Sequence, residues 1–304
     1  MSITEYKIEH LDNKPPRFKG INYPVPLKDN IQRPYYCAVA CGIRGSGKSY
    51  ACHKMLSNQI KSGFINPDTG ERCAIRNILF SQTIEGNPIW KTLKYLDEDD
   101  CHDDYSESKL GEILEELKQN RKETENYIEY VKAYNTFEKM SEEEFKKWRD
   151  ADAIMLLEMY DFCHPRELKA NVKYPNGCIT NIILDDCLSN KEAFSSKKSS
   201  LLNRLVLNGR HYQANVIICA QNLKAISKSI RLNTQVWMLF KFKSMKILID
   251  DIYQDICSNL LTEDEFISLY EKATENDNDF FCIDEKDKKE NRFKKNFDVI
   301  LRIE

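Results

Sequence analysis

The residues with the clearest chemical meaning form one octapeptide, GIRGSGKS at positions 42–49. It fits the pattern G-x-x-x-x-G-K-[ST] at every fixed position. Glycines let the backbone curl so that its N–H groups face phosphate oxygens, and a following helix adds positive potential at its N-terminus. Lys48 is expected to reach the β- and γ-phosphates of ATP, and the Ser49 hydroxyl to bind Mg²⁺. The predicted nucleotide-binding residues are Gly42, Ile43, Arg44, Gly45, Ser46, Gly47, Lys48, Ser49 and Tyr50.

Two acids can supply the carboxylates that such a site needs. Asp185 and Asp186 follow the apolar residues Ile182–Leu184, and open α/β sheets place their active sites at the carboxyl ends of strands. We expect Asp185 to hold the metal, directly or through water, and Asp186 to polarise the attacking water. Gln221 ends the next apolar run, NVIICA. Its amide is expected to lie beside the γ-phosphate and to sense hydrolysis.

Other cationic side chains are candidates for contacts between subunits or with nucleic acid. A guanidinium that enters a neighbouring subunit's site neutralises transition-state charge, and Arg210 and Arg231 are the two candidates for this role. Sequence spacing assigns neither, and a surface salt bridge is the alternative for each. Lysines that follow the predicted strand ends are candidates for phosphate-backbone contacts, with solvated loop lysines as the alternative. They are Lys191, Lys197, Lys198, Lys224 and Lys228.

Short apolar runs separated by helical patterns must position these residues. Runs at 35–41, 75–82, 178–185, 215–220 and 235–242 predict strands, the first of them directly before the octapeptide. Such nearly continuous apolar runs are typical of parallel strands buried on both faces. Helices are predicted at 49–60 and 199–211. The sequence therefore predicts a RecA-like α/β fold, with a mostly parallel central sheet flanked by helices.

The predicted organisation has an N-terminal arm and one larger domain. Residues 1–34 contain five prolines and are interpreted as an irregular arm, and residues 35–304 as a P-loop ATPase domain. A highly charged helical insertion is predicted at about 85–176, with helices at 107–132 and 141–160. Beyond residue 245, the patterns predict helices at 245–256 and 262–273 and short strands at 279–283 and 298–303.

Composition limits the classes of function. The 304 residues are 41% hydrophobic and 31% charged, as in globular proteins, and the net charge of −3 argues against a simple basic DNA-binding module. No apolar run approaches the roughly 20 residues of a membrane span, and residues 1–20 lack the apolar middle of a signal peptide. Eleven cysteines without a C-x-x-C pair predict reduced, buried thiols in a cytosol-like compartment. Metal binding at Cys101-His102 or Cys163-His164 is the alternative.

Several segments together resemble one family. The order GIRGSGKS, IILDD, LNGRHYQANVIICAQN and SIRLNTQVWMLFKF is similar to the poxvirus-type DNA-packaging ATPases of large DNA viruses and virophages, within the FtsK/HerA superfamily. The resemblance covers residues 35–61 and 178 to about 284. It implies Walker A roles for Lys48 and Ser49, Walker B roles for Asp185 and Asp186, and a sensor role for Gln221. Many superfamily members have Glu where this chain has Asp186.

The resemblance also implies partners and a place of action. These are a homo-oligomeric ring and double-stranded DNA moved into a preformed capsid by ATP hydrolysis. The partner of the helical insertion is left open, with a capsid or portal-like protein as one candidate. The implied location is the viral assembly site in the host cytoplasm, or the virion. Two alternatives stay open at this point: a P-loop phosphotransferase acting on a small molecule, and a nucleotide-bound scaffold or regulatory ATPase without motor activity.

Overall fold

The computed structural model describes residues 24–28, 31–187 and 200–303. Most of the predicted N-terminal arm and Lys191, Lys197 and Lys198 therefore lie outside the described residues. A nine-stranded sheet is the centre of the described fold, in the order β11-β10-β9-β8-β2-β7-β6-β4-β5. Its strands are β2 (Cys37–Cys41), β4 (Ala74–Ser81), β5 (Cys101–His102), β6 (Cys178–Asp185), β7 (Ala214–Ala220), β8 (Val236–Phe240), β9 (Phe280–Asp284), β10 (Phe293–Lys295) and β11 (Val299–Ile300).

The sheet is parallel from β8 to β5 and antiparallel from β8 to β11. Every residue of β2, β6, β7 and β8 is buried, as expected for strands covered by helices on both faces. One strand, β7, separates the strand before the glycine-rich loop (residues 42–49) from the strand that ends in the acidic pair. This order, with helices on both faces, confirms the predicted α/β fold class. A second small sheet pairs β1 (Val25–Pro26) with β3 (Phe64–Ile65).

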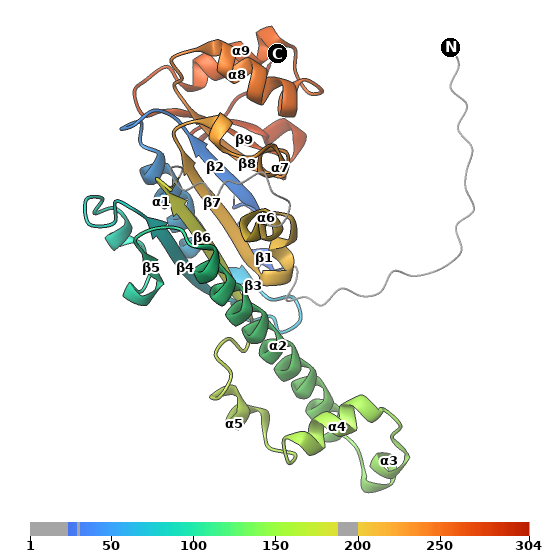
Figure 1. The fold of residues 1–304 in the computed structure, drawn as a ribbon. Helices are drawn as coiled ribbons and strands as arrows, with labels where there is room; N and C mark the ends of the chain where they lie inside the picture. The colour runs from blue at the N-terminus through green and yellow to red at the C-terminus, as the bar shows by residue number, and fades with distance from the viewer. Residues whose placement is uncertain (1–23, 29–30, 188–199, 304) are drawn as a thin grey trace, which may run out of the picture.

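Helices cover the two faces unequally (Figure 1). The helix α1 (Lys48–Ser62) packs Ala51, Cys52, Met55 and Leu56 against one face. The opposite face is covered by the first half of α2 (Glu107–Phe137), by α6 (Leu201–Tyr212) and by α9 (Glu263–Ala273). In the sequence, short α7 (Lys228–Leu232) connects β7 to β8, and α8 (Met245–Leu248) follows β8. Helix α8 continues directly as a π-helix, η5 (Ile249–Cys257). The sheet therefore has a hydrophobic core on each side.

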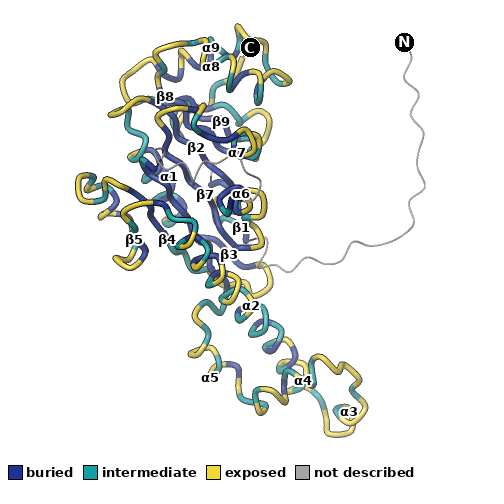
Figure 2. The backbone as a smooth tube through the Cα atoms, viewed as in Figure 1, coloured by how far each residue is buried: buried dark blue, intermediate teal, exposed yellow. Residues whose placement is uncertain are grey.

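The helical insertion extends away from the sheet (Figures 1 and 2). Helix α2 has 31 residues, which corresponds to about 46 Å at 1.5 Å per residue. Its second half packs with α4 (Ala151–Met159) and α5 (Pro165–Lys169) in a separate, aromatic-rich cluster around Tyr130 and Leu157. The prediction of one continuous helix at 141–160 is wrong. The chain forms α3 (Glu142–Lys147), turns at Trp148, and starts α4 at Asp150, whose side chain accepts a hydrogen bond from Ala153 N–H.

Other element boundaries also differ from the predictions. The strand predicted at 298–303 is limited to β11, and β1, β3, β5 and β10 were not predicted. These strands have two or three residues each, which is too short for an alternating pattern to be recognised. Of the helices in the described residues, none has the length and apolar character to cross a membrane.

A row of buried asparagines connects three neighbouring strands. Asn77, Asn181 and Asn215 lie opposite one another in β4, β6 and β7 and are at most 1% exposed. Asn215 Nδ2 donates to Asn181 Oδ1 at 2.7 Å, and Asn181 Nδ2 donates to Asn77 Oδ1 at 2.8 Å. The row ends on backbone groups, because Tyr36 N–H donates to Asn215 Oδ1 and Asn77 Nδ2 donates to Lys94 O. A one-residue slip of any strand would break it, so the row fixes the register.

We therefore expect Asn181→Ala to lower the free energy of unfolding by about 2–6 kcal/mol. The substitution leaves one acceptor and one donor buried without partners, and each costs about 1–3 kcal/mol. Urea unfolding followed by circular dichroism measures the change. Asn259→Ala, at an exposed turn position, is the control and should cost less than about 0.5 kcal/mol. A loss at Asn181 no larger than the control would show that the row does not stabilise the sheet.

Candidate active site

Parallel strands bring the predicted site residues to one edge of the sheet. Cys41, the last residue of β2, lies opposite Ala220 of β7 and Leu239 of β8. Asp185, the last residue of β6, lies opposite Cys219 of β7. The glycine-rich loop begins directly after β2. Its first residue, Gly42, donates its N–H to Ala220 O of β7 at 3.1 Å. The loop, the acidic pair and Gln221 therefore start from the carboxyl ends of adjacent strands.

The loop's shape requires glycine at particular positions. Gly45 and Gly47 have φ values of +78° and +94°, which residues with a Cβ rarely adopt. A Cβ on Gly42 would lie 2.5 Å from Phe240 Cβ and 2.8 Å from Ser46 Oγ. The loop is thus folded tightly against the end of β8, and the pattern of glycines follows from this packing as well as from the backbone conformation.

The helix that follows the loop has an uncapped N-terminus. Gly47 is the N-cap residue of α1 and offers no side-chain hydrogen bond, and the first turn contains no acid. Helices α2, α6 and α9 are instead capped by the side chains of Ser106, Ser200 and Thr262. The first N–H groups of a helix have no intrahelical acceptor and lie at the positive end of the helix dipole. The N-terminus of α1 is therefore suited to an anion such as phosphate.

Lys48 lies over the loop that precedes it. Its Nζ donates to Gly42 O at 3.0 Å and to Ile43 O at 2.8 Å. The ammonium group is thereby held beside the N–H groups of the loop, which can bind an anion. When phosphate binds, Lys48 can donate one of these hydrogen bonds to a phosphate oxygen in place of a backbone carbonyl. The remaining predicted loop residues include Arg44, which is exposed, and Tyr50, which is 64% exposed in the first turn of α1.

The structure brings Ser49 and Asp185, the two predicted metal-binding residues, together. Ser49 Oγ donates to Asp185 Oδ2 at 2.9 Å, and Asp185 is 3% exposed. A buried carboxylate needs hydrogen bonds to offset its lost hydration, and a second one comes from Trp90, whose Nε1 donates to the same oxygen at 2.7 Å. The Ser49 hydroxyl and Asp185 carboxylate offer only oxygen donors, which fits a hard cation such as Mg²⁺. Trp90 was not predicted, and no pattern in its surroundings marks it.

Asp186 and Gln221 are also brought together. Gln221 Nε2 donates to Asp186 Oδ1 at 2.6 Å, so the amide orients the carboxylate. Asp186 has a φ of +60°, a left-handed conformation that Asp and Asn tolerate better than most residues. The two acids therefore have different partners: Asp185 pairs with Ser49, and Asp186 with the end of β7.

The two candidate arginines lie elsewhere in the chain. Arg231 is in α7, and its guanidinium lies 3.6 Å from Asp251 Oδ1 and 3.6 Å from Asp255 Oδ2, both in η5. Its side chain is 12% exposed, and Nη1 also donates to Leu223 O at 3.4 Å. Arg210 is exposed in the last turn of α6, directly before β7 begins. That is the opposite edge of the sheet from the glycine-rich loop of the same chain.

The predicted lysines in the described residues are both exposed. Lys224 lies in the short η4 turn (Leu223–Ala225), and Lys228 Nζ lies 3.7 Å from Asp255 Oδ1. Both follow the carboxyl end of β7, which agrees with their predicted place near the site edge. Lys228 is the exposed partner of this pair, and Asp255 is half-buried; at 3.7 Å and with one partner in solvent the pair contributes little stability.

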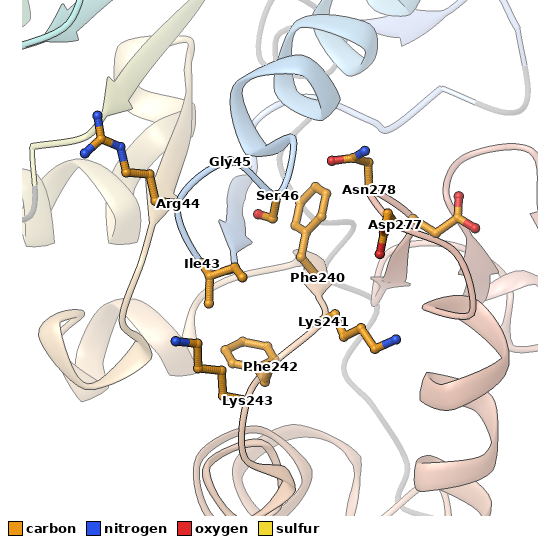
Figure 3. A pocket seen from close by; sticks show the side chains of 11 residues that line it. Ile43, Arg44, Gly45, Ser46, Phe240, Lys241, Phe242, Lys243, Asp277 and Asn278 are labelled. Carbon is orange, nitrogen blue, oxygen red and sulfur yellow. The ribbon is translucent and has the colours of Figure 1, made fainter.

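A cavity of about 530 Å³ adjoins the glycine-rich loop. It lies between the loop, the end of β8 and the turn before β9 (Figure 3). Aromatic, basic and acidic side chains line it together: Ile43, Arg44, Gly45, Ser46, Phe240, Lys241, Phe242, Lys243, Asp277, Asn278 and Asp279. Asn278 has a φ of +66° and would contact a Cβ on Gly47 at 3.6 Å. The residues of β8 and of this turn were not predicted as site residues, although KFKSMK after an apolar strand is a basic and aromatic signal.

Comparison with known proteins finds similar solved structures. No family model and no curated protein matches the chain. One similar structure is the genome packaging NTPase B204 from Sulfolobus turreted icosahedral virus 2 in complex with sulfate. It is 13% identical with a TM-score of 0.43, over 84% of this chain and 94% of B204.

Two other similar structures come from larger proteins. The pCW3 conjugation coupling protein TcpA is 13% identical with a TM-score of 0.37, over 85% of this chain and 59% of TcpA. The cytoplasmic domain of the Thermomonospora curvata type VII secretion ATPase EccC is 11% identical with a TM-score of 0.38, over 90% of this chain and 28% of EccC. At these values the likeness adds nothing to what the sheet order and the site geometry show.

Proposed function

We propose that this chain binds and hydrolyses ATP·Mg²⁺ at the glycine-rich loop, and that its oligomer uses the hydrolysis to move double-stranded DNA. The observation that supports the enzymatic part is the convergence of three elements at one sheet edge. These are the loop with Lys48, the Ser49–Asp185 pair, and the Asp186–Gln221 pair. Anion binding, an oxygen-only cation site and an oriented carboxylate are together what phosphoryl transfer to water requires.

Each group has a defined task in this proposal. The loop N–H groups and Lys48 bind the β- and γ-phosphates, while Ser49 and Asp185 would hold Mg²⁺, which supplies positive charge that offsets the charge developing on the phosphate oxygens. Asp186 orients a water molecule for attack on the γ-phosphorus and accepts its proton. The bond from the γ-phosphorus to the bridging oxygen breaks, giving ADP and phosphate. Gln221, directly after β7, donates a hydrogen bond to Asp186 Oδ1. A movement of Asp186 when the γ-phosphate leaves would therefore also move Gln221 and the end of β7.

We further propose that the cavity beside the loop accepts the base and ribose of the nucleotide. It adjoins Gly45 and Ser46, and the half-buried ring of Phe242 offers it apolar surface (Figure 3). Stacking on aromatic rings is a common way of holding a nucleobase. Lys241 and Lys243, from the same segment, add positive charge beside the phosphate site.

DNA contact is proposed for exposed lysines at the same edge of the sheet. Lys224 follows β7, and Lys246 lies in α8 after β8; both are exposed. A homo-oligomeric ring would collect such lysines from several subunits, which compensates for the net charge of −3 of one chain. Arg210 and Arg231 both stay candidates for the arginine that completes a neighbour's site: Arg210 is exposed at the end of α6, and Arg231 lies beside Asp251 and Asp255. Capsid proteins, the viral assembly site and the virion stay predictions.

The test is steady-state ATP hydrolysis with and without linear duplex DNA, at low and moderate salt. We expect DNA to stimulate turnover several-fold, and the stimulation to fade as salt rises, because phosphate contacts weaken steeply with salt. Lys224→Glu should reduce the stimulation. The matched control Lys139→Glu, at an exposed position in the insertion, should leave it unchanged.

Two results would contradict the proposal in different ways. Hydrolysis by an assembled oligomer that DNA does not change would reject the motor and favour a scaffold or regulatory ATPase. Transfer of the γ-phosphate to a small-molecule acceptor would favour a phosphotransferase. Neither result would remove the ATP site itself.

A further inference from the structure

We propose that Trp90 is a positioning residue for the metal site: its indole N–H fixes the orientation of the Asp185 carboxylate that would bind Mg²⁺. This inference rests on the proposed function of the site. Trp90 is 1% exposed, and its Nε1 donates to Asp185 Oδ2 at 2.7 Å. The same oxygen accepts the Ser49 hydroxyl at 2.9 Å. One carboxylate oxygen of Asp185, at the end of β6, therefore accepts hydrogen bonds from two other segments, the glycine-rich loop and the segment that contains Trp90.

The local structure fixes Trp90 relative to both of its partners in the site. It begins the short helix η2 (Trp90–Thr92), in the segment after β4. Its ring belongs to the core on the α1 side of the sheet, and its centroid lies 6.5 Å from that of His53 in α1. Thr92 Oγ1 lies 3.0 Å from His53 Nε2, within hydrogen-bond distance. The η2 segment is thus attached to α1, the helix that carries Ser49, while Trp90 holds the end of β6.

The chemistry of indole suits a supporting role. Its N–H only donates, so Trp90 neither binds a cation nor accepts a proton. A hydrogen bond to a metal-binding carboxylate limits its rotation and keeps it ready for the cation, and such supporting contacts affect metal affinity strongly. Burial strengthens the bond, because little water competes for the same oxygen. Trp90 therefore acts on the cation through Asp185 and has no direct contact with the reacting atoms.

The alternative is that Trp90 only fills the core, and a second tryptophan allows the two roles to be separated. Trp237, in β8, is fully buried as well, but its Nε1 has no hydrogen-bond partner among the described residues. Trp→Phe at either position removes a similar amount of buried ring. Only at Trp90 does it also remove a hydrogen bond to Asp185. Trp237→Phe is therefore the matched control.

The experiment measures Mg²⁺ binding without turnover. Full-length protein is saturated with a non-hydrolysable ATP analogue, and the rise in thermal stability is followed as Mg²⁺ is added. We expect Trp90→Phe to raise the half-saturating Mg²⁺ concentration by about 10-fold or more, and Trp237→Phe to change it less than about 2-fold. Affinity for the analogue in EDTA should be alike in both variants, since no metal is then held.

The outcomes separate this inference from the proposed function. If wild-type protein responds to Mg²⁺ and Trp90→Phe shifts the response no more than Trp237→Phe does, Trp90 is a core residue only and the inference is wrong. If wild-type protein binds no analogue and shows no Mg²⁺ response, the proposed function fails, and the role of Trp90 fails with it.

A second measurement applies if Trp90→Phe does not fold. The chain has three tryptophans, so Trp148→Phe combined with Trp237→Phe leaves Trp90 as the one tryptophan, which is excited selectively at a wavelength where tyrosine does not absorb. We expect its fluorescence to change as Mg²⁺ is added to the analogue-bound protein, with the same midpoint as the thermal response. Adding Asp185→Asn should abolish the change. Emission that Mg²⁺ leaves unaltered would overturn the inference.

Discussion

Lys48→Ala is expected to reduce ATP turnover by at least about 100-fold, the usual cost of removing one fixed group that stabilises transition-state charge. Lys48 Nζ is held by Gly42 O and Ile43 O above the loop, so the substitution removes the one ammonium group that the loop itself positions. Alanine is a good helix former, and Lys48 is the first residue of α1. The fold should therefore survive, and steady-state hydrolysis with DNA present measures the loss.

Lys54→Ala is the matched control in the same helix. Lys54 Nζ forms a salt bridge of 2.7 Å with Asp298, and both side chains are more than a third exposed, so its loss should cost less than about 1 kcal/mol of stability. Turnover by this variant should equal that of wild type. If Lys48→Ala folded normally and kept its turnover, the glycine-rich loop could not be the site of hydrolysis.

That most residues of the candidate site lie together could be predicted from the sequence, because parallel strands gather their carboxyl ends. The octapeptide, Asp185 and Gln221 each follow an apolar run, so once the strands are parallel they must meet at one edge. The sequence does not encode Trp90's role in the same way. Its contact with Asp185 depends on how the segment after β4 folds onto α1. Such a tertiary contact has no periodic signal.

The helices and strands depend mainly on local signals, and one of these signals was missed. Strands β2, β6, β7 and β8 were recognisable because burial on both faces makes them continuously apolar. The break between α3 and α4 was missed because apolar residues continue at helical spacing through Trp148. The Asp150 side chain caps the N-terminus of α4 and so fixes where the new helix begins. An Asp directly before a helical pattern is a start signal that would have predicted the break.

The cysteines illustrate how burial decides chemistry. Cys37 and Cys41 lie in β2, where burial raises the pKa of each thiol to about 12. At neutral pH these thiols stay protonated, and a protonated thiol is a poor nucleophile and metal ligand. Cys219, beside the end of β7, has a thiol pKa raised well above its ordinary value through its contact with Cys52 and its burial. Near the site, cysteine therefore acts as a small core residue.

Asp186→Asn is expected to lower turnover by about 100- to 10,000-fold, the range for removing a general base, while leaving ATP binding within a few-fold of wild type. Asn keeps the size of the side chain and tolerates the left-handed backbone at φ +60°, so the structure should be preserved. The amide cannot accept the proton of the attacking water. Turnover and the affinity for a non-hydrolysable analogue, measured on the same protein, separate the chemical step from binding.

The controls use the same backbone geometry and a longer acid. Asp161→Asn changes an exposed aspartate in the insertion with a φ of +49° and should leave turnover unchanged. Asp186→Glu restores a carboxylate but places it one methylene farther from the backbone. A non-glycine residue in the left-handed conformation costs about 1–3 kcal/mol, and Asp tolerates this conformation better than Glu. We expect partial turnover, because the hydrogen bond from Gln221 Nε2 has the correct length for the aspartate carboxylate and would not hold the glutamate carboxylate in the same place. Full activity in Asp186→Asn would show that Asp186 is not the base.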